Sequence, residues 1–237
     1  MPSQLNVQLT GRIQNIIFYK RGDKYYARSV PFSVKQTTAT KKRASEFGRA
    51  STLGKHFRHQ LLPAIHLPTD NGMQTRLVSA LFQWLRSGYN FSEACETVPY
   101  LHNFQFTGGD TIRERWRVNI TVSHPEDNVL LITIPSFTPV KSISAPAGTQ
   151  RVICHLAVAA CDVHTGQPKG GFSTSLDLNY DAAEFPQQSI PVAIDTAAGN
   201  LVLTAVSLEY FSVNNGFLQK IAKKAFMPSG VVSAFYF

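Results

Sequence analysis

Seven segments rich in β-branched and aromatic residues occupy the chain after residue 110, and they restrict the possible folds more than any other feature. Pro, Gly, Asn and Asp separate them at spacings typical of an antiparallel β-sandwich. The segments are Trp116–Val122, Val129–Ile134, Arg151–Val158, Ser173–Asn179, Ser189–Asp195, Leu201–Phe211 and Val231–Phe237. The last one should be a paired strand, because a free apolar edge of this kind would aggregate.

A helical hydrophobic period precedes these segments. Two predicted helices, Thr40–Leu62 and Met73–Ser87, each carry one apolar stripe. The stripe residues are Ala44, Phe47, Ala50, Leu53, Phe57 and Leu61 in the first, and Met73, Leu77, Ala80, Leu81, Trp84 and Leu85 in the second. Gly48 and Gly54 should each weaken the first helix by about 1 kcal/mol relative to Ala, so we expect a bend or break there. Two such helices joined by a short loop predict an αα-hairpin.

The segment Ile13–Val30 predicts a β-hairpin. Its strand-forming runs are Ile16–Tyr19 and Tyr25–Ala27, and Arg21-Gly22-Asp23 between them is typical of a turn. Gly22 can adopt the positive φ that a tight hairpin turn requires. A hairpin alone is only marginally stable, so we expect it to pack on another element.

The order of these patterns predicts an α+β fold in two parts. An N-terminal β-hairpin and αα-hairpin, over residues 1–90, are followed by an antiparallel β-sandwich over residues 110–237. The 237 residues are enough for about one or two domains with a sizeable hydrophobic core.

Charge is distributed very unevenly along the chain. Residues 1–60 contain 12 of the 23 Lys and Arg residues but only two of the 15 acidic residues, which gives this segment a net charge of +10. The remaining 177 residues therefore carry a net charge of −2. Clustered cations of this kind favour a partner that is a polyanion. An acidic protein partner and a merely solubilising surface are the alternatives.

Aromatic residues alternate with cations in the predicted hairpin, as they do in proteins that stack bases and hold phosphates. Strand formers that simply pack on the helices would give the same pattern. The candidate nucleic-acid-binding residues combine this hairpin with the basic face of the first helix. They are Lys20, Arg21, Lys24, Tyr25, Arg28, Lys41, Lys42, Arg43 and Arg49.

No motif in the sequence indicates catalysis or a cofactor. The GxSxG, HExxH, GxGxxG and CxxC patterns are missing, and the acidic residues are scattered. His56 and His59 lack a third ligand at fixed spacing, and Cys154 and Cys161 should point to opposite faces of one strand. We therefore expect buried structural cysteines, no metal, no cofactor and no enzymatic activity.

These features predict a non-catalytic protein that binds nucleic acid non-specifically through its basic N-terminal region. The main alternative is a structural subunit of a multiprotein assembly, such as a phage-like particle or a secretion or surface machine. In that case the basic region would dock on a neighbouring subunit, and the protein would form homo-oligomers or larger arrays. A β-sandwich enzyme is the last of the three possibilities.

The sequence also predicts a cytoplasmic protein without a membrane span. No apolar run approaches the ~18–20 residues that a spanning helix needs, and the first residues do not have the pattern of a signal peptide. The three cysteines, an odd number, favour a reducing compartment over a disulfide framework.

The first 85 residues resemble an uncharacterised family of Bacteroidota genomes. In that family a GxxxNxxxYxxxGxxxxR hairpin, a Thr-rich stretch and an Arg/Lys-led helix precede a β-sandwich. The matching residues are Gly11, Asn15, Tyr19, Arg28, Lys35-Gln36-Thr37, Thr38, Lys42-Arg43-Ala44 and Phe47-Gly48. Gly22 follows Tyr19 after three residues instead of four. The resemblance implies a hairpin–helices–sandwich layout and carries no activity or site residues.

Overall fold

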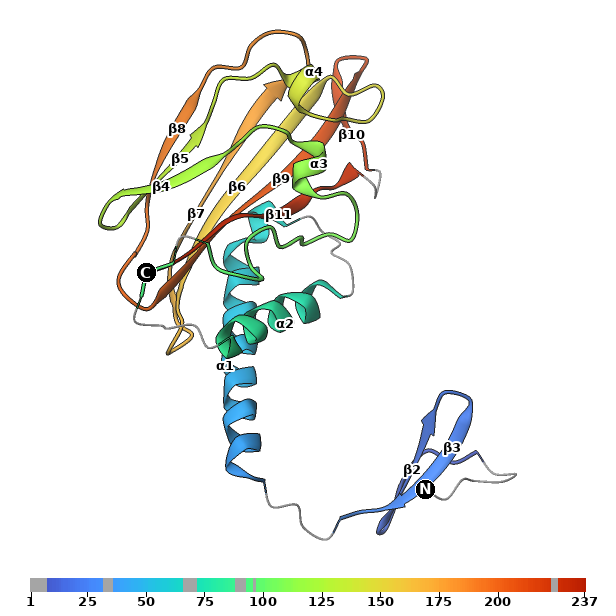
Figure 1. Ribbon diagram of the computed structural model, residues 1–237. Helices are drawn as coiled ribbons and strands as arrows, with labels where there is room; N and C mark the ends of the chain where they lie inside the picture. Colours follow the sequence, from blue (N-terminus) through green and yellow to red (C-terminus); the bar gives the residue numbers. More distant parts are fainter. Residues whose placement is uncertain (1–7, 32–35, 66–71, 88–92, 96, 223–225) are drawn as a thin grey trace. The chain divides into compact units, whose positions relative to one another are not determined.

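The computed structural model describes residues 8–31, 36–65, 72–87, 93–95, 97–222 and 226–237. It confirms the α+β fold, with an N-terminal sheet, helices and C-terminal antiparallel sheets (Figure 1). The chain divides into two compact units, residues 1–42 and residues 43–237. Lys35, which contributes to the family resemblance, lies outside the described residues.

The N-terminal unit contains a small antiparallel sheet. Strands β2 (Ile16–Arg21) and β3 (Lys24–Ser29) confirm the predicted hairpin, and β1 (Gly11–Ile13) adds a strand that the sequence did not predict. The turn between β2 and β3 consists of two residues, and Gly22 in it has a φ of +62°, as expected for a tight hairpin.

Helix α1 (Thr38–Gln60) begins in the N-terminal unit and continues into the second unit. Thr37 caps it, because its Oγ1 accepts a hydrogen bond of 3.2 Å from the backbone N–H of Thr40. The helix is continuous through Gly48 and Gly54, so it does not break at either position.

Five strands form the central sheet of the second unit, and β9 (Asn200–Asn214) and β6 (Arg151–Asp162) lie at its middle. β7 (Pro168–Asn179) pairs with the other side of β6. The far edge of β9 is shared by β10 (Phe217–Lys220) and β11 (Ser229–Tyr236), each pairing with a different part of it. All these pairings are antiparallel, and β11 confirms the paired C-terminal strand.

A second antiparallel sheet covers one face of the central sheet and completes the sandwich. Its order is β4 (Thr121–Glu126), β5 (Val129–Ile134) and β8 (Gln188–Ala193). The core between the two sheets takes alternate residues of each strand. The buried core residues contributed by β5, β6 and β9 are Leu130, Ile132, Ile134, Val152, Cys154, Leu156, Val158, Ala160, Val202, Val206, Leu208 and Tyr210.

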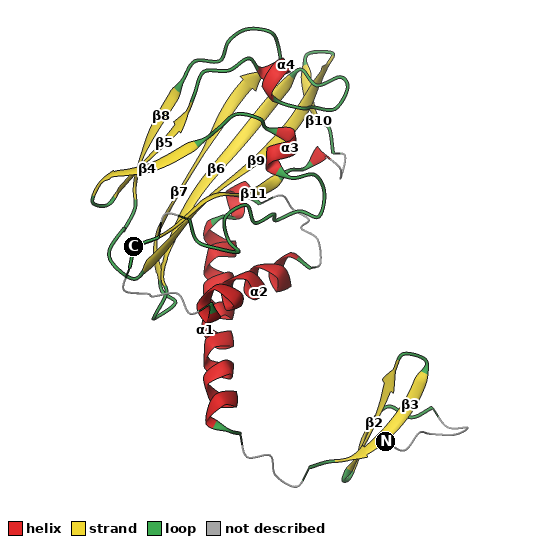
Figure 2. Ribbon diagram, in the orientation of Figure 1, coloured by secondary structure: helices red, strands yellow, loops and turns green. Residues whose placement is uncertain are grey.

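The helices pack on the opposite face of the central sheet and form a third layer (Figure 2). The intervening residues of β6, β9 and β11 share one hydrophobic core with α1, the short helix η1 (Leu62–Ala64) and α2 (Met73–Arg86). All six predicted stripe residues of α2 are buried, whereas Ala44 and Phe47 of α1 are exposed. The helices, which the sequence groups with the hairpin in residues 1–90, thus share their core with the sheets.

Two short helices and one short strand differ from the predicted pattern. A capping box at Thr111 and Glu114 starts α3 (Ile112–Arg115), so the predicted strand Trp116–Val122 is wrong over its first half and β4 begins only at Thr121. Helix α4 (Pro139–Ser142) and β10 were not predicted, because both are too short to show a hydrophobic period.

The two glycines within α1 should respond oppositely to the same substitution. A Cβ at Gly54 would lie 3.0 Å from Cγ2 of Val78, where α1 and α2 cross, but a Cβ at Gly48 would meet no atom within 4 Å. We expect Gly54→Leu to lower the free energy of unfolding by about 1–3 kcal/mol through overpacking. Gly48→Leu should raise it by about 0.5–1 kcal/mol through helix propensity. Urea denaturation of both variants tests this, and a loss of stability in Gly48→Leu equal to that in Gly54→Leu would contradict it.

Candidate polyanion-binding surface

The register of the N-terminal sheet sorts its side chains onto two different faces. Residues directly opposite each other on neighbouring strands point to the same side, and Tyr19 is opposite Tyr26. We call the side that these two residues share the aromatic–basic face. Its members are Arg12, Ile17, Tyr19, Arg21, Lys24, Tyr26 and Arg28. The other side, here called the apolar face, contains Ile13, Ile16, Phe18, Lys20, Tyr25 and Ala27.

The tyrosines of the aromatic–basic face form one platform across two strands. The ring centroids of Tyr19 and Tyr26 are 5.8 Å apart, and the ring planes are inclined by only 25°. The Arg28 guanidinium lies 5.7 Å from the centroid of Tyr19, a distance at which a cation–π interaction is favourable. Tyr25 is separate from this platform and lies under the Lys20 ammonium on the apolar face, at 5.6 Å.

The electrostatic balance of this sheet is strongly positive. Residues 8–31 contain five Lys and Arg residues and one acidic residue, Asp23, which lies in the β2–β3 turn. None of the five cations forms an ion pair with another residue in the part of the chain that the structure describes. Arg12 donates a hydrogen bond of 2.9 Å to the backbone oxygen of Gln14, which leaves its charge uncompensated.

The start of α1 is a second concentration of positive charge. Lys41, Lys42 and Arg43 are exposed, and the first turn of the helix contains no acidic residue. Backbone N–H groups at a helix N-terminus carry a partial positive charge, so three cations in the adjacent turn are not stabilised by the helix dipole. The positive electrostatic potential of the backbone N–H groups and that of the three side chains therefore add at the N-terminal end of α1.

Arg49 differs from the other predicted contact residues. Its Nε and Nη2 donate hydrogen bonds of 3.3 and 2.9 Å to the backbone oxygen of Val163, just after β6. The guanidinium therefore holds α1 against the central sheet. Arg49 is structurally engaged in this way, and its contact with nucleic acid stays a prediction.

The contact residues predicted from the sequence do not include four members of the aromatic–basic face, which are Arg12, Ile17, Tyr19 and Tyr26. A two-residue turn at Gly22 and Asp23 pairs residues whose numbers add to 45, so the pairing of Tyr19 with Tyr26 could have been derived from the turn. Arg12 could not have been found in this way, because β1 has only three residues and a weak strand pattern.

Cys154 and Cys161 are buried, as the sequence predicted. Cys154 is buried in the sandwich core and Cys161 in the core under the helices, on opposite faces of β6. Burial raises the pKa of both thiols, and with the nearby charge of Asp162 it raises the pKa of Cys161 to about 12. Such thiols stay protonated at neutral pH and are poor nucleophiles. Among the described residues, no group of three or more His, Cys, Asp or Glu side chains could hold a metal ion.

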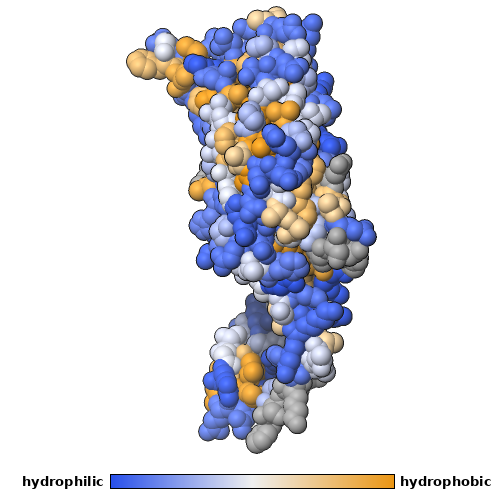
Figure 3. All heavy atoms as spheres, turned by 90° about the vertical axis from the view of Figure 1, so that its left-hand side faces the viewer, coloured by the Kyte–Doolittle hydropathy of each residue, from blue (hydrophilic) through white to orange (hydrophobic). Residues whose placement is uncertain are grey.

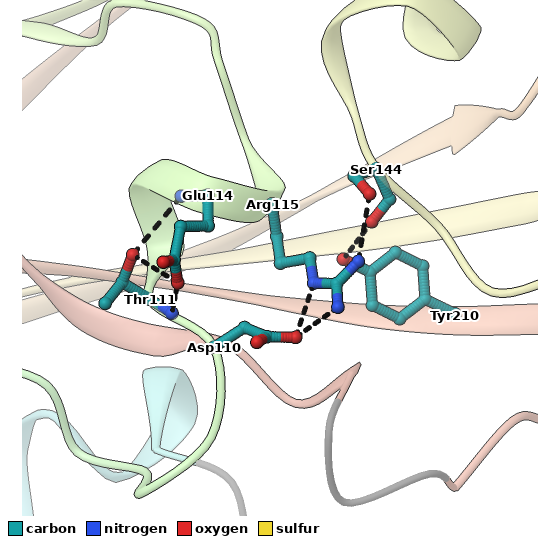
Figure 4. Close-up of polar contacts among 6 residues, drawn as sticks. All are labelled: Asp110, Thr111, Glu114, Arg115, Ser144 and Tyr210. Carbon is teal, nitrogen blue, oxygen red and sulfur yellow. Dashed lines mark hydrogen bonds and ion pairs between the residues drawn. The ribbon is translucent and has the colours of Figure 1, made fainter.

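A polar network of the second unit surrounds Arg115 (Figure 4). Its guanidinium pairs with Asp110, donates a 2.9 Å hydrogen bond to Ser144 Oγ and lies 3.8 Å from the ring centroid of Phe226. Tyr210 donates a 3.4 Å hydrogen bond to the backbone oxygen of Ser144, and burial raises the pKa of Tyr210. Arg115 thus connects Asp110, in the loop before α3, with Ser144, which Tyr210 of β9 contacts in turn.

A substitution at Arg115 should show that this network is structural. We expect Arg115→Gln to lower the free energy of unfolding by about 1–3 kcal/mol, because the half-buried Asp110 loses its partner. Arg113→Gln, at an exposed position two residues earlier, should change it by less than about 0.5 kcal/mol. Thermal and urea denaturation measure both effects. Equal stability of the two variants would show that the network contributes little.

No helix in the described ranges is long and apolar enough to cross a membrane. In Figure 3 the viewed face is mostly hydrophilic, and hydrophobic residues form separate patches within it.

Comparison with protein-family models and with curated protein sequences finds no match for this chain. The resemblance to the Bacteroidota family therefore stays a prediction.

Proposed function

We propose that this chain is a non-catalytic binding protein that engages nucleic acid through its basic N-terminal region. The observation that carries the proposal is the aromatic–basic face, where four cations and two tyrosines share one side of a sheet without a carboxylate on that side. The exposed cations Lys41, Lys42 and Arg43 support it. A cytoplasmic location, in which the three cysteines stay reduced, is part of this proposal.

The binding would be dominated by phosphate contacts. Lys and Arg side chains release condensed counterions when they neutralise phosphates, so the affinity falls steeply with salt. Contacts to the backbone of a nucleic acid position the protein but carry no sequence information. The protein should therefore bind with little sequence preference, through the cations of the sheet and of the start of α1.

Charge removal at the start of α1 tests this proposal. We expect the triple variant Lys41→Gln, Lys42→Gln and Arg43→Gln to bind an oligonucleotide more weakly. The slope of log K against log salt should fall by about 2–3, one unit or slightly less for each lost phosphate contact. Fluorescence anisotropy across a salt series measures both quantities.

A matched control carries the same change of charge in the second unit. Arg117, Lys141 and Lys169 are exposed, and their triple Gln variant should retain the affinity and the slope of the unmodified protein. A salt-independent affinity, or equal losses in the two triple variants, would refute specific use of the basic N-terminal region. If the protein binds polyglutamate but not the oligonucleotide, its partner is an acidic protein instead.

A structural subunit of a larger assembly is the second candidate, and exposed apolar side chains favour it. Ile13 and Ile16 on the apolar face are 58% and 45% exposed, and Phe217 in β10 is 76% exposed. Surfaces of this kind are often covered by another subunit. Light scattering after nuclease treatment separates the two functions, because discrete oligomers without nucleic acid would favour assembly.

A further inference from the structure

The tyrosine platform of the N-terminal sheet, formed by Tyr19 and Tyr26, adds aromatic rings to the cations of the aromatic–basic face. We propose that the aromatic–basic face binds single-stranded nucleic acid by stacking bases on Tyr19 and Tyr26. This inference rests on the proposed function and narrows it to one class of ligand. A duplex presents only phosphates and groove edges to such a surface, whereas a single strand can turn its bases onto aromatic rings.

The geometry of the platform suits stacking. Tyr19 and Tyr26 are a directly opposed pair on β2 and β3, their rings stack on each other, and the Arg28 guanidinium lies over the Tyr19 ring. A base that binds here would extend this stack. Because the rings come from a paired hairpin, their positions are held by the strand ladder. A rigid aromatic surface loses little conformational entropy when a base stacks on it.

The cations of this face are arranged around the platform. Along β2 and β3, the pair Arg21 and Lys24 precedes the tyrosine pair on one side, and Arg28 follows it on the other side. Successive pairs on one face of a sheet are two residues, about 7 Å, apart. A single strand of nucleic acid that runs along the hairpin would therefore contact Arg21 and Lys24 first, then the two tyrosine rings, and then Arg28. The cations can bind its phosphates, and the rings can stack on its bases.

The apolar face provides a control within the same sheet. Phe18 is next to Tyr19 in sequence but points to the other side, where it shares the face with Ile16, Lys20 and Tyr25. An aromatic residue that contributes only to strand propensity should behave alike on both faces. An aromatic residue that stacks on bases should matter on the aromatic–basic face alone.

Binding measurements on the full chain test the inference. The two labelled ligands are an oligothymidine of about 15 nucleotides and a duplex of about 15 base pairs. The double variant Tyr19→Leu and Tyr26→Leu should bind oligothymidine about tenfold or more weakly. Its salt slope should be unchanged, because every cation is retained. The corresponding double Phe variant should restore binding, since it keeps the rings, and Phe18→Leu should bind like the unmodified protein.

Three outcomes overturn the inference. They are an equal affinity for single strand and duplex, an equal loss in Phe18→Leu, and an unchanged affinity of the double Leu variant. In each case the proposed function survives if the Lys41, Lys42 and Arg43 variant still loses affinity and slope. Absence of all oligonucleotide binding at low salt removes both.

Ultraviolet crosslinking of the unmodified chain to oligothymidine gives an independent result if the Leu variants do not fold. Crosslinks that mass spectrometry assigns to Tyr19 or Tyr26 support stacking on the platform. Crosslinks at Tyr25, or only in the second unit, contradict it.

Discussion

The structure depends on the burial of both faces of the central sheet. Strands β6 and β9 are apolar on both sides over most of their length, so alternate side chains enter two different cores. A sheet with two apolar faces needs a layer on each side. The strands β4, β5 and β8 supply one layer, and α1, η1 and α2 supply the other. The second sheet and the helices therefore cover the two opposite faces of one central sheet and form a single unit with it.

The helices cover only part of one face of the central sheet. Beyond the helices, polar side chains lie on this face of the sheet. His155 and Glu209 project from the same side as the residues under the helices but are only half-buried. Burial acts to raise the pKa of Glu209, but hydrogen bonds from Lys220 and His155 and the positive charge of Lys220 outweigh it, so its pKa lies below the ordinary value. Polar pairs thus replace apolar contacts at the border of the helical layer.

The N-terminal sheet differs from the central sheet, because none of its described residues belongs to either hydrophobic core. Arg21 lies directly opposite Lys24, and like charges in this arrangement destabilise a strand pair. Lys41, Lys42 and Arg43 follow the positive end of α1, where cations are also unfavourable. Repulsions that act against folding are expected where a surface must attract an anion, and this supports binding as the role of the region.

Local patterns in the sequence predicted the parts of the fold that depend on near neighbours. The stripe of α2, the strand Val129–Ile134 and the positive φ of Gly22 follow from periods and turn chemistry within a few residues. Which element packs on each face of a helix or sheet could not be predicted from such local patterns. That the helices cover the central sheet, that Gly54 lies at a helix crossing and that Arg49 binds the Val163 carbonyl all depend on contacts distant in sequence. The sequence by itself determined the elements and the placement of charge, whereas tertiary packing decided the layers, because burial rewards whichever apolar faces meet.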